Sequence, residues 1–223
     1  MKEKELASKL EEFVLGEGAA VFGTAPIKEI KPAFDLSQKE LEGLDYAISF
    51  GFKLSDSVLD GIIEHPTKLY FHHYRMVNMF LDQLSLKAVR IIEKDGFRAL
   101  AIPASQIVDW KKQSSYLSHR KIAYLAGLGW VGRNNLLVHP EFGSQLRFAT
   151  VLTSIKLPFK EPLKFGCGDC KLCVAACPVS AIAEDPGDFN HLSCYNKLDQ
   201  FRKKNFVGQH ICGICVKVCR KKA

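Results

Sequence analysis

The sequence predicts an α/β (α+β) fold that is followed by a small cysteine-rich module. Apolar segments of strand length alternate with amphipathic segments of helix length over most of the chain, which is typical of helices packed on a sheet. No cysteine precedes Cys167, and all eight follow within the last third. Pro158 and Pro162 indicate a linker, so we expect one domain over residues 1–163 and a second over residues 164–223.

The individual elements are predicted from hydrophobic periodicity. Helices are expected where apolar residues recur at three- and four-residue intervals, over residues 2–15, 75–94 and 119–126. In the longest of these helices, the apolar stripe is formed by Val77, Phe80, Leu84, Ala88 and Ile91. Strands are expected in short apolar runs, over residues 19–23, 45–50, 97–102, 136–138 and 146–152.

Length and composition favour a cytoplasmic globular protein. The chain has 223 residues, of which 47% are apolar, so it is long enough to bury a core. No apolar run approaches the roughly 20 residues that a membrane-spanning helix needs. The charged start, MKEKEL, lacks the apolar region of a signal peptide, so we expect neither export nor a membrane partner.

The cysteines form two related patterns. The first is a C-x2-C-x2-C-x3-C-P run over residues 167–178, and the second is a C-x2-C-x3-C run over residues 212–219 that follows the isolated Cys194. In bacterial ferredoxins with this spacing, three close thiolates bind one cluster and the fourth binds the other. Disulfides are typical of short secreted chains, and zinc sites commonly contain C-x2-C pairs. Neither requires a third cysteine after two more residues and a fourth after three, followed by proline.

We therefore predict two 4Fe–4S clusters that exchange their fourth ligands. One cluster is assigned to Cys167, Cys170, Cys173 and Cys219, and the other is assigned to Cys177, Cys194, Cys212 and Cys215. Each cluster with its four thiolates carries about −2, so two of them would lower the formal net charge from +7 to about +3. The excess of lysine and arginine then offsets cluster charge and is no sign of nucleic-acid binding.

A glycine-rich segment matches the dinucleotide-binding fingerprint only in its letters. Gly127, Gly129 and Gly132 have the G-x-G-x-x-G spacing, but a helical segment precedes them where the fingerprint needs a strand. Residues 149–155 also contain no acid where the fingerprint places one, so we reject a nicotinamide cofactor. Two interpretations remain: the glycines let the backbone approach a ligand, or they let the chain pack tightly on itself.

The segment LAGLGWVGRNNLL at residues 125–137, the HPEFG at residues 139–143 and the cysteine layout together resemble the epoxyqueuosine reductase family, which is related to reductive dehalogenases. The resemblance is specific from about Ser118 to Cys219 and weaker over residues 45–103. It implies a nitroreductase-like α/β domain followed by a two-cluster bacterial-ferredoxin-like module, with a cobalamin between them. By position, the cobalamin-lining residues would be Gly127, Gly129, Leu137, His139 and Phe148.

The sequence departs from the family pattern at the catalytic acid. The family has an aspartate in an Asp-Ser/Thr-x-Pro stretch, whereas the matching residues 113–116 read QSSY. Gln113, Tyr116 and His119 are the candidates to replace it, and His119 has the suitable ordinary pKa, unless it is a structural histidine. The helical repeats that help the family bind tRNA would lie beyond Ala223, so we expect no strong tRNA binding. Because the catalytic acid is also missing, we expect no epoxyqueuosine reduction.

Three further groups each allow two interpretations. His72 and His73, near the start of the long helix, either reach a ligand or form a polar first turn. Trp130 either stacks on a cofactor or joins the core. The basic runs at residues 202–204 and 220–222 are either solvated surface or a dock for an acidic electron donor such as ferredoxin or flavodoxin.

The function that we expect is that of an iron–sulfur oxidoreductase of the epoxyqueuosine reductase-like group. It would deliver electrons from two 4Fe–4S clusters, through a cobalamin, to an unidentified small molecule or protein. The alternative is an electron-transfer protein that reduces a partner, such as a corrinoid protein, and has no substrate chemistry of its own. A corrinoid retained on purification would favour the first function.

Overall fold

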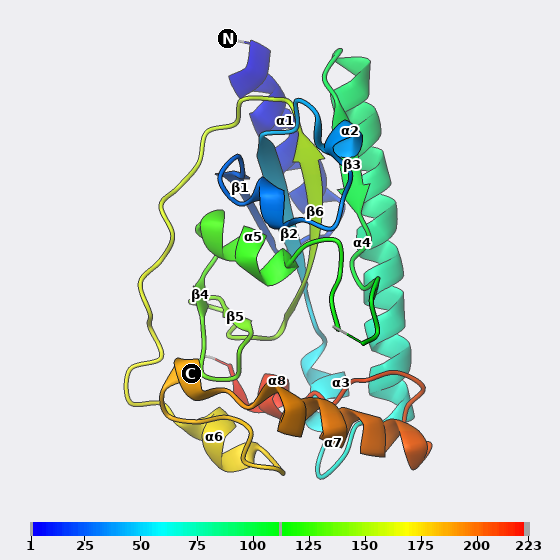
Figure 1. Ribbon diagram of the computed structural model, residues 1–223, viewed down its shortest axis with the longest axis vertical. Coiled ribbons are helices and arrows are strands. Elements are labelled where there is room, and N and C mark those ends of the chain that lie inside the picture. Colours follow the sequence, from blue (N-terminus) through cyan, green and yellow to red (C-terminus); the bar gives the residue numbers. More distant parts are fainter. Residues whose placement is uncertain (1, 112, 221–223) are drawn as a thin grey trace. The chain divides into compact units, whose positions relative to one another are not determined.

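The structure is a computed structural model that describes residues 2–111 and 113–220, and it divides into two compact units (Figure 1). The first unit comprises Met1–Phe52, Asn78–Leu128 and Arg147–Leu163. The second unit comprises Lys53–Val77, Gly129–Leu146 and Lys164–Ala223. All eight cysteines therefore share a unit with two stretches that precede them in the sequence. The functional division into domains 1–163 and 164–223 stays a prediction.

The first unit is built on a four-stranded sheet with the strand order β1-β2-β6-β3. Its strands are β1 (Val21–Pro26), β2 (Tyr46–Lys53), β3 (Ala99–Ile102) and β6 (Leu146–Thr153). β1 pairs antiparallel with β2, and β3 pairs antiparallel with β6. In β6 every residue except Arg147 is buried, because helices cover both faces of the sheet, and the strand therefore reads as an apolar run.

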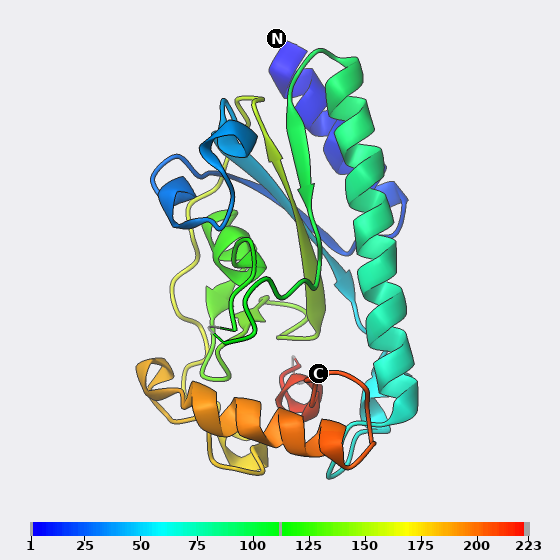
Figure 2. The ribbon, with the colours of Figure 1, turned by 45° about the vertical axis from the view of Figure 1, so that its right-hand side comes forward.

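Helices lie on both faces of this sheet. They are α1 (Lys2–Gly16), α2 (Gln38–Leu41), α5 (His119–Leu125) and residues 78–94 of α4 (Lys68–Lys94). Figure 2 shows α1 and α4 over one face, with α2, α5 and the 3-10 turn η1 (Lys31–Ala33) over the other. The core on the α2 and α5 side is formed by Ile27, Leu41, Leu44, Ala47, Ile102, Leu117, Ile122 and Leu152.

The long helix α4 differs from its prediction in two respects. It begins at Lys68, not at residue 75, because the hydroxyl of Thr67 accepts a hydrogen bond from the Tyr70 N–H at 3.0 Å and caps the first turn. The buried stripe is formed by Val77, Leu81, Leu84, Ala88 and Ile92. Phe80 and Ile91, which were predicted to be in the stripe, are half-buried at its edges.

The other elements lie close to their predicted positions. The expected helices over residues 2–15 and 119–126 are confirmed as α1 and α5, and Ser118 caps α5 by accepting from the Lys121 N–H at 3.2 Å. The five expected strands are confirmed, with shifted ends, as β1, β2, β3, β5 (Leu137–Val138) and β6. A short strand inside the glycine-rich segment, β4 (Trp130–Val131), was not predicted, and it pairs with β5.

The second unit consists of short elements around the cysteines. They are α3 (Asp56–Asp60), the β4–β5 hairpin, α6 (Leu172–Ala176), the 3-10 turn η2 (Pro186–Asp188), α7 (His191–Lys203) and α8 (Ile214–Val218). α6 and α8 contact each other and repeat one design: each has five residues, a cysteine in second place and a cysteine as its C-cap. No helix within the described residues is long and apolar enough to cross a membrane.

Candidate functional site

Seven of the eight cysteines lie around α6 and α8, and α7 contributes the eighth. Cys173 is in α6 and Cys177 caps it, while Cys215 is in α8 and Cys219 caps it. Cys167 and Cys170 precede α6, Cys212 precedes α8, and Cys194 lies in α7. All eight are free thiols. The repeated C-x2-C-x3-C spacing therefore produces two similar turns of helix, each of which carries one cysteine inward and ends on the next.

Electrostatic coupling sorts the thiols into two groups. Burial, followed by charge at Cys219, Cys167 and Cys170, raises the pKa of Cys173 to about 11. We call these four residues the first centre.

Burial also raises the pKa of Cys212 to about 11, and charge at Cys194 and Cys177 adds to the shift. Burial, and then charge at Cys212, Cys194, Cys173 and Cys177, raises the pKa of Cys215 well above its ordinary value. We call Cys177, Cys194, Cys212 and Cys215 the second centre. Because charge at Cys173 also raises the pKa of Cys215, the two centres adjoin at these two residues.

The donor set suits metal clusters chemically. Buried thiols with raised pKa values resist becoming thiolates, and a bound metal reverses this because a coordinating thiol is deprotonated outright. Soft sulfur ligands select iron–sulfur clusters and zinc among biological metals. Within residues 2–111 and 113–220, no three histidine, cysteine or acidic side chains are placed to hold a single metal ion.

The β4–β5 hairpin and the turn after it contact the first centre. The indole Nε1–H of Trp130 donates to Cys167 Sγ at 3.2 Å. The Ser144 N–H donates to Cys219 O at 3.1 Å. The Ser144 hydroxyl also hydrogen-bonds to the Cys219 thiol. This second bond lowers the pKa of the thiol and so opposes burial, which raises it. Neither of the two roles that the sequence suggested for Trp130, core residue or cofactor stack, included a hydrogen bond to a cysteine. The hairpin is therefore part of the site.

Arg133 fixes the loop that carries the first two cysteines. Its guanidinium donates to the carbonyl oxygens of Gly168 at 2.9 Å, Cys170 at 3.1 Å and Glu184 at 2.6 Å. The residue is 9% exposed, and its guanidinium lies over the ring of Phe165. A buried cation bonded to main-chain oxygens holds the loop and places a positive charge near the cysteines.

The glycine-rich segment packs against the protein's own chain. A Cβ atom at Gly129 would lie 2.2 Å from Val138 O, and one at Gly132 would lie 2.5 Å from Val138 Cγ2. Gly127 has φ +69°, and a Cβ there would lie 3.1 Å from Glu161 O. These contacts correspond to the tight-packing interpretation of the three glycines.

The residues expected to line a cobalamin belong to both units. Gly127 and Phe148 are in the first unit, while Gly129, Leu137 and His139 are in the second. Leu137 and Phe148 are buried. His139 Nδ1 accepts from the Glu141 and Phe142 N–H groups, and its ring stacks on Phe142 with centroids 5.0 Å apart. A cobalamin site made by these five residues stays a prediction.

His119 has both ring nitrogens in hydrogen bonds. Nε2 lies 2.9 Å from the carbonyl oxygen of Pro103, so it carries the proton, and Nδ1 accepts from the Thr150 hydroxyl at 2.8 Å. Burial is the main reason that its pKa falls to about 4, although the bond to Pro103 opposes the shift. This is the arrangement of a neutral structural histidine. As a proton donor, His119 would first have to leave one of these partners.

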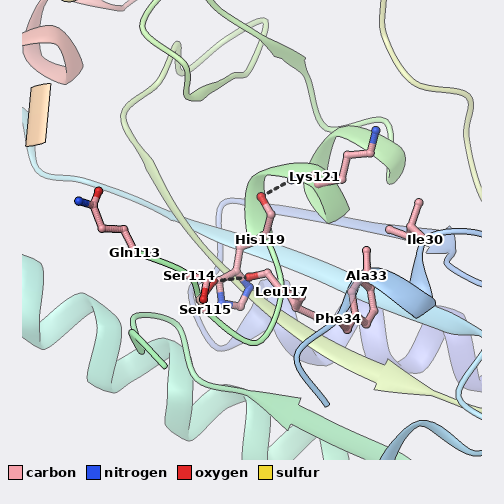
Figure 3. A pocket seen from close by; sticks show the side chains of 10 residues that line it. Ile30, Ala33, Phe34, Gln113, Ser114, Ser115, Leu117, His119 and Lys121 are labelled. Carbon is pink, nitrogen blue, oxygen red and sulfur yellow. Dashed lines mark hydrogen bonds between the residues drawn. The ribbon is translucent and has the colours of Figure 1, made fainter. Parts of the chain in front are cut away.

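A pocket of about 590 Å³ in the first unit includes two of the three proposed catalytic residues (Figure 3). Gln113 and His119 line it, together with apolar residues such as Phe34, whereas Tyr116 packs against the core cluster. The Gln113 side chain points away from the other labelled side chains. Gln113 also has φ +53°, a left-handed conformation that is uncommon outside glycine. Their catalytic roles stay predictions.

Four of the other polar residues have structural partners. His73 Nε2 accepts from the Ser55 N–H at 3.1 Å, at the start of α3. Arg202 and Lys203 both pair with Asp199, and Arg220 pairs with Asp60 at 3.3 Å. The rest of the second basic run, residues 221–222, lies outside the described residues.

The amino-acid sequence has relatives among the epoxyqueuosine reductases. The chain is 37% identical to that of Staphylococcus aureus over 115 residues, which make up 47% of this chain and 30% of that protein. It is 27% identical to that of Aliivibrio fischeri over 175 residues, 70% of this chain and 43% of that protein. No protein-family model matches the chain. The chain is a distant relative of the epoxyqueuosine reductases.

Solved structures show the same fold. A reductive dehalogenase structure that "suggests a mechanism for B12-dependent dehalogenation" matches 97% of this chain and 31% of its own, with a TM-score of 0.75 and 20% identity. The epoxyqueuosine reductase from Streptococcus thermophilus matches 95% of this chain and 65% of its own, with a TM-score of 0.62 and 19% identity. The chain thus shares the mixed α/β fold of epoxyqueuosine reductases and reductive dehalogenases, and spans less than two thirds of the relatives' length.

The close approach of Gly143 to Cys219 gives the first testable prediction. Gly143 has φ +57°, and a Cβ there would lie 1.9 Å from Cys219 O, whereas Gly168 has φ +47° and open space around it. Gly143→Ala should therefore displace a ligand of the first centre at a cost of about 3 kcal/mol or more, whereas Gly168→Ala carries only the left-handed penalty of about 1–2 kcal/mol. Iron and sulfide analysis of anaerobic protein should show a loss in Gly143→Ala alone. Equal metal content in both variants would contradict the role of Gly143.

The lowered pKa of His119 predicts a pH dependence of stability. The unfolded histidine binds a proton near pH 6.5 and the folded one near pH 4, so this contribution is complete above pH 6.5 and decreases as the pH falls toward 4. Between pH 7 and pH 5 the free energy of unfolding should fall by about 2 kcal/mol from this residue. Denaturant titrations of His119→Gln should lack this slope, and those of His72→Gln, at an exposed histidine, should keep it. An unchanged slope in His119→Gln would show that the ring is accessible to protons.

Proposed function

We propose that the protein is an iron–sulfur oxidoreductase in which two 4Fe–4S clusters deliver single electrons to an acceptor. The proposal rests on the electrostatic effects among the eight thiols, which group them into two centres of four. Each centre contains cysteines from both patterns. Four cysteines are the ligand set of one cubane cluster, and exchange of the fourth ligand is the arrangement that the spacing predicts. The relationship to reductases supports a redox role.

The proximity of α6 and α8 supports electron exchange between the clusters. Cys173 in α6 and Cys215 in α8 belong to different centres, and yet charge at Cys173 contributes to the raised pKa of Cys215. Burial is the largest cause of the raised pKa at both thiols, so both ligands are partly withdrawn from solvent. A soluble one-electron donor of the ferredoxin or flavodoxin class would supply the electrons. The acceptor is a small molecule or a protein.

A more specific form of this proposal is that a cobalamin accepts the electrons directly from the clusters. The B12-dependent dehalogenase of the same fold supports it. When bound, a cobalamin supplies a cobalt ion capable of redox and radical chemistry. The observations at the glycines weigh against the proposed lining, because Val138 and Glu161 already fill the space beside Gly129 and Gly127. For this reason we assign no reaction step to a cobalamin.

The second candidate function is electron transfer to a partner protein without substrate chemistry. The hydrogen-bonded state of His119 favours it, since this ring is not poised to donate a proton. Residues 113–116, QSSY, also lack the aspartate of the family pattern. For the same reason we do not propose epoxyqueuosine in tRNA as the substrate.

The cluster assignment predicts the behaviour of the Cys177→Ser variant. Anaerobic wild-type protein should contain about eight iron and eight sulfide ions per chain. In Cys177→Ser, electron paramagnetic resonance should show a changed second centre, which holds Cys194, Cys212 and Cys215, and an unchanged first centre. Cys170→Ser is the matched control and should change only the first centre. Stoichiometric zinc without sulfide would refute the proposed function, and loss of the first centre in Cys177→Ser would refute the exchange.

Titration with cob(II)alamin separates the two candidate functions. If the protein binds cobalamin itself, the cobalt electron paramagnetic resonance signal should change as reconstituted protein is added, and the change should saturate at about one cobalamin per chain. An unaltered cobalt signal at saturating protein would rule out the corrinoid and favour electron transfer to a partner. Apo-protein prepared with an iron chelator provides the control for non-specific binding.

A further inference from the structure

We infer that Trp130, Arg133 and Ser144 give the first centre a higher reduction potential than the second, so that an electron shared by the two centres resides mainly at the first. The inference rests on the proposed function, because it requires clusters at both centres. Reduction adds one electron to a cluster, and groups that stabilise negative charge near its sulfur ligands therefore raise its potential. All three residues lie in the stretch Gly129–Leu146, which belongs to the second unit.

Trp130 supplies a fixed hydrogen-bond donor to the first centre. An indole nitrogen can only donate, so the 3.2 Å contact places an N–H on the sulfur of Cys167. The ring packs closely against Gly166, where an added Cβ would lie only 2.9 Å from it. A donor to an anionic sulfur strengthens as charge accumulates there, so this hydrogen bond favours the reduced state.

Ser144 supplies a second donor, and Asn134 orients it. The Nδ2 group of Asn134 donates to Ser144 Oγ at 3.0 Å, so this oxygen acts as an acceptor there and its own proton is free to point elsewhere. Asn134 is itself held because its Oδ1 accepts from the Leu136 N–H at 3.2 Å. Ser144 is 3% exposed, and its hydroxyl hydrogen-bonds to the thiol of Cys219. The donated proton therefore reaches a second ligand of the first centre.

Arg133 adds a full positive charge that solvent screens little. Its guanidinium bonds to the carbonyl oxygens of Gly168 and Cys170, so the charge lies beside the loop that carries two ligands of the first centre. At 9% exposure its interaction with a nearby cluster is stronger than that of a surface cation. A cation at this place favours the more negative, reduced cluster.

The contacts at the second centre are of a different kind. Cys177 Sγ accepts from the Ala181 N–H at 3.2 Å, and Cys212 is hydrogen-bonded by the main chain of Ile214. Lys197 also lowers the pKa of Cys212, but this lysine is half-buried, and its ammonium lies 4.9 Å from the ring centroid of Phe201. Solvent screens such a charge more than it screens Arg133. The first centre therefore has the stronger stabilisation of added charge.

The test is a potentiometric titration of both clusters, followed by electron paramagnetic resonance. In wild-type protein the first centre, identified by the altered spectrum of Cys170→Ser, should be reduced before the second. Trp130→Phe keeps an aromatic ring and removes the donor, so the ratio of reduced to oxidised first centre at the wild-type midpoint should fall by roughly threefold to tenfold. The second centre should keep its midpoint. Trp110→Phe, at a tryptophan in the first unit, is the matched control.

A second variant keeps the test decisive if Trp130→Phe loses its clusters. Ser144→Ala should lower the midpoint of the first centre in the same direction, and Ser144→Thr should restore it, because threonine returns the hydroxyl. Full iron and sulfide content with unchanged midpoints in the alanine or phenylalanine variants would overturn the inference, as would earlier reduction of the second centre in wild-type protein. Absence of clusters from wild-type protein would instead overturn the proposed function.

Discussion

The gathering of eight thiols in one small unit, with Cys170 alone among them exposed, is the constraint on which the rest of that unit depends. Burial raises the pKa of Cys173, Cys212 and Cys215, so without metal these residues are neutral and provide no attraction between the segments that carry them. α6 and α8 have only five residues each, too few to be stable through helix formation alone. In the proposed function, metal binding would join both helices with α7, and its free energy would thereby become folding free energy of the unit.

The β4–β5 hairpin is adapted to the first centre through backbone contacts. Gly129 and Gly132 let β4 lie against Val138, and Gly143 lets the next turn lie against Cys219. In this position Trp130 and Arg133 reach the cysteine loop with an indole N–H and a guanidinium. The resemblance in this segment therefore has a physical explanation within the second unit. The close packing of the hairpin requires glycine at these positions, and that packing brings the Trp130 and Arg133 side chains to the cysteine loop.

Local features of the sequence predicted the local features of the structure. Hydrophobic periodicity predicted the helix over residues 119–126, which is present as α5, and the two related cysteine patterns correspond to the matching helices α6 and α8. Features that depend on distant partners were missed. His119 is hydrogen-bonded to Thr150 and Pro103, and the indole N–H of Trp130 donates to Cys167. These partners are far apart in the sequence, so hydrophobic periodicity could not predict the hydrogen bonds. The start of α4 was missed because Leu69, Tyr70 and Phe71 are consecutive and show no helical spacing of apolar residues.

Anomalous diffraction at the iron edge, from anaerobically grown crystals, would locate the iron atoms and their ligands. We expect eight iron sites per chain in two cubes. One cube should be bound by Cys167, Cys170, Cys173 and Cys219, and the other should include Cys177 together with Cys194. Iron bound by Cys177 in the same cube as Cys167 would refute the exchange of ligands, and single metal ions in place of cubes would refute the two clusters.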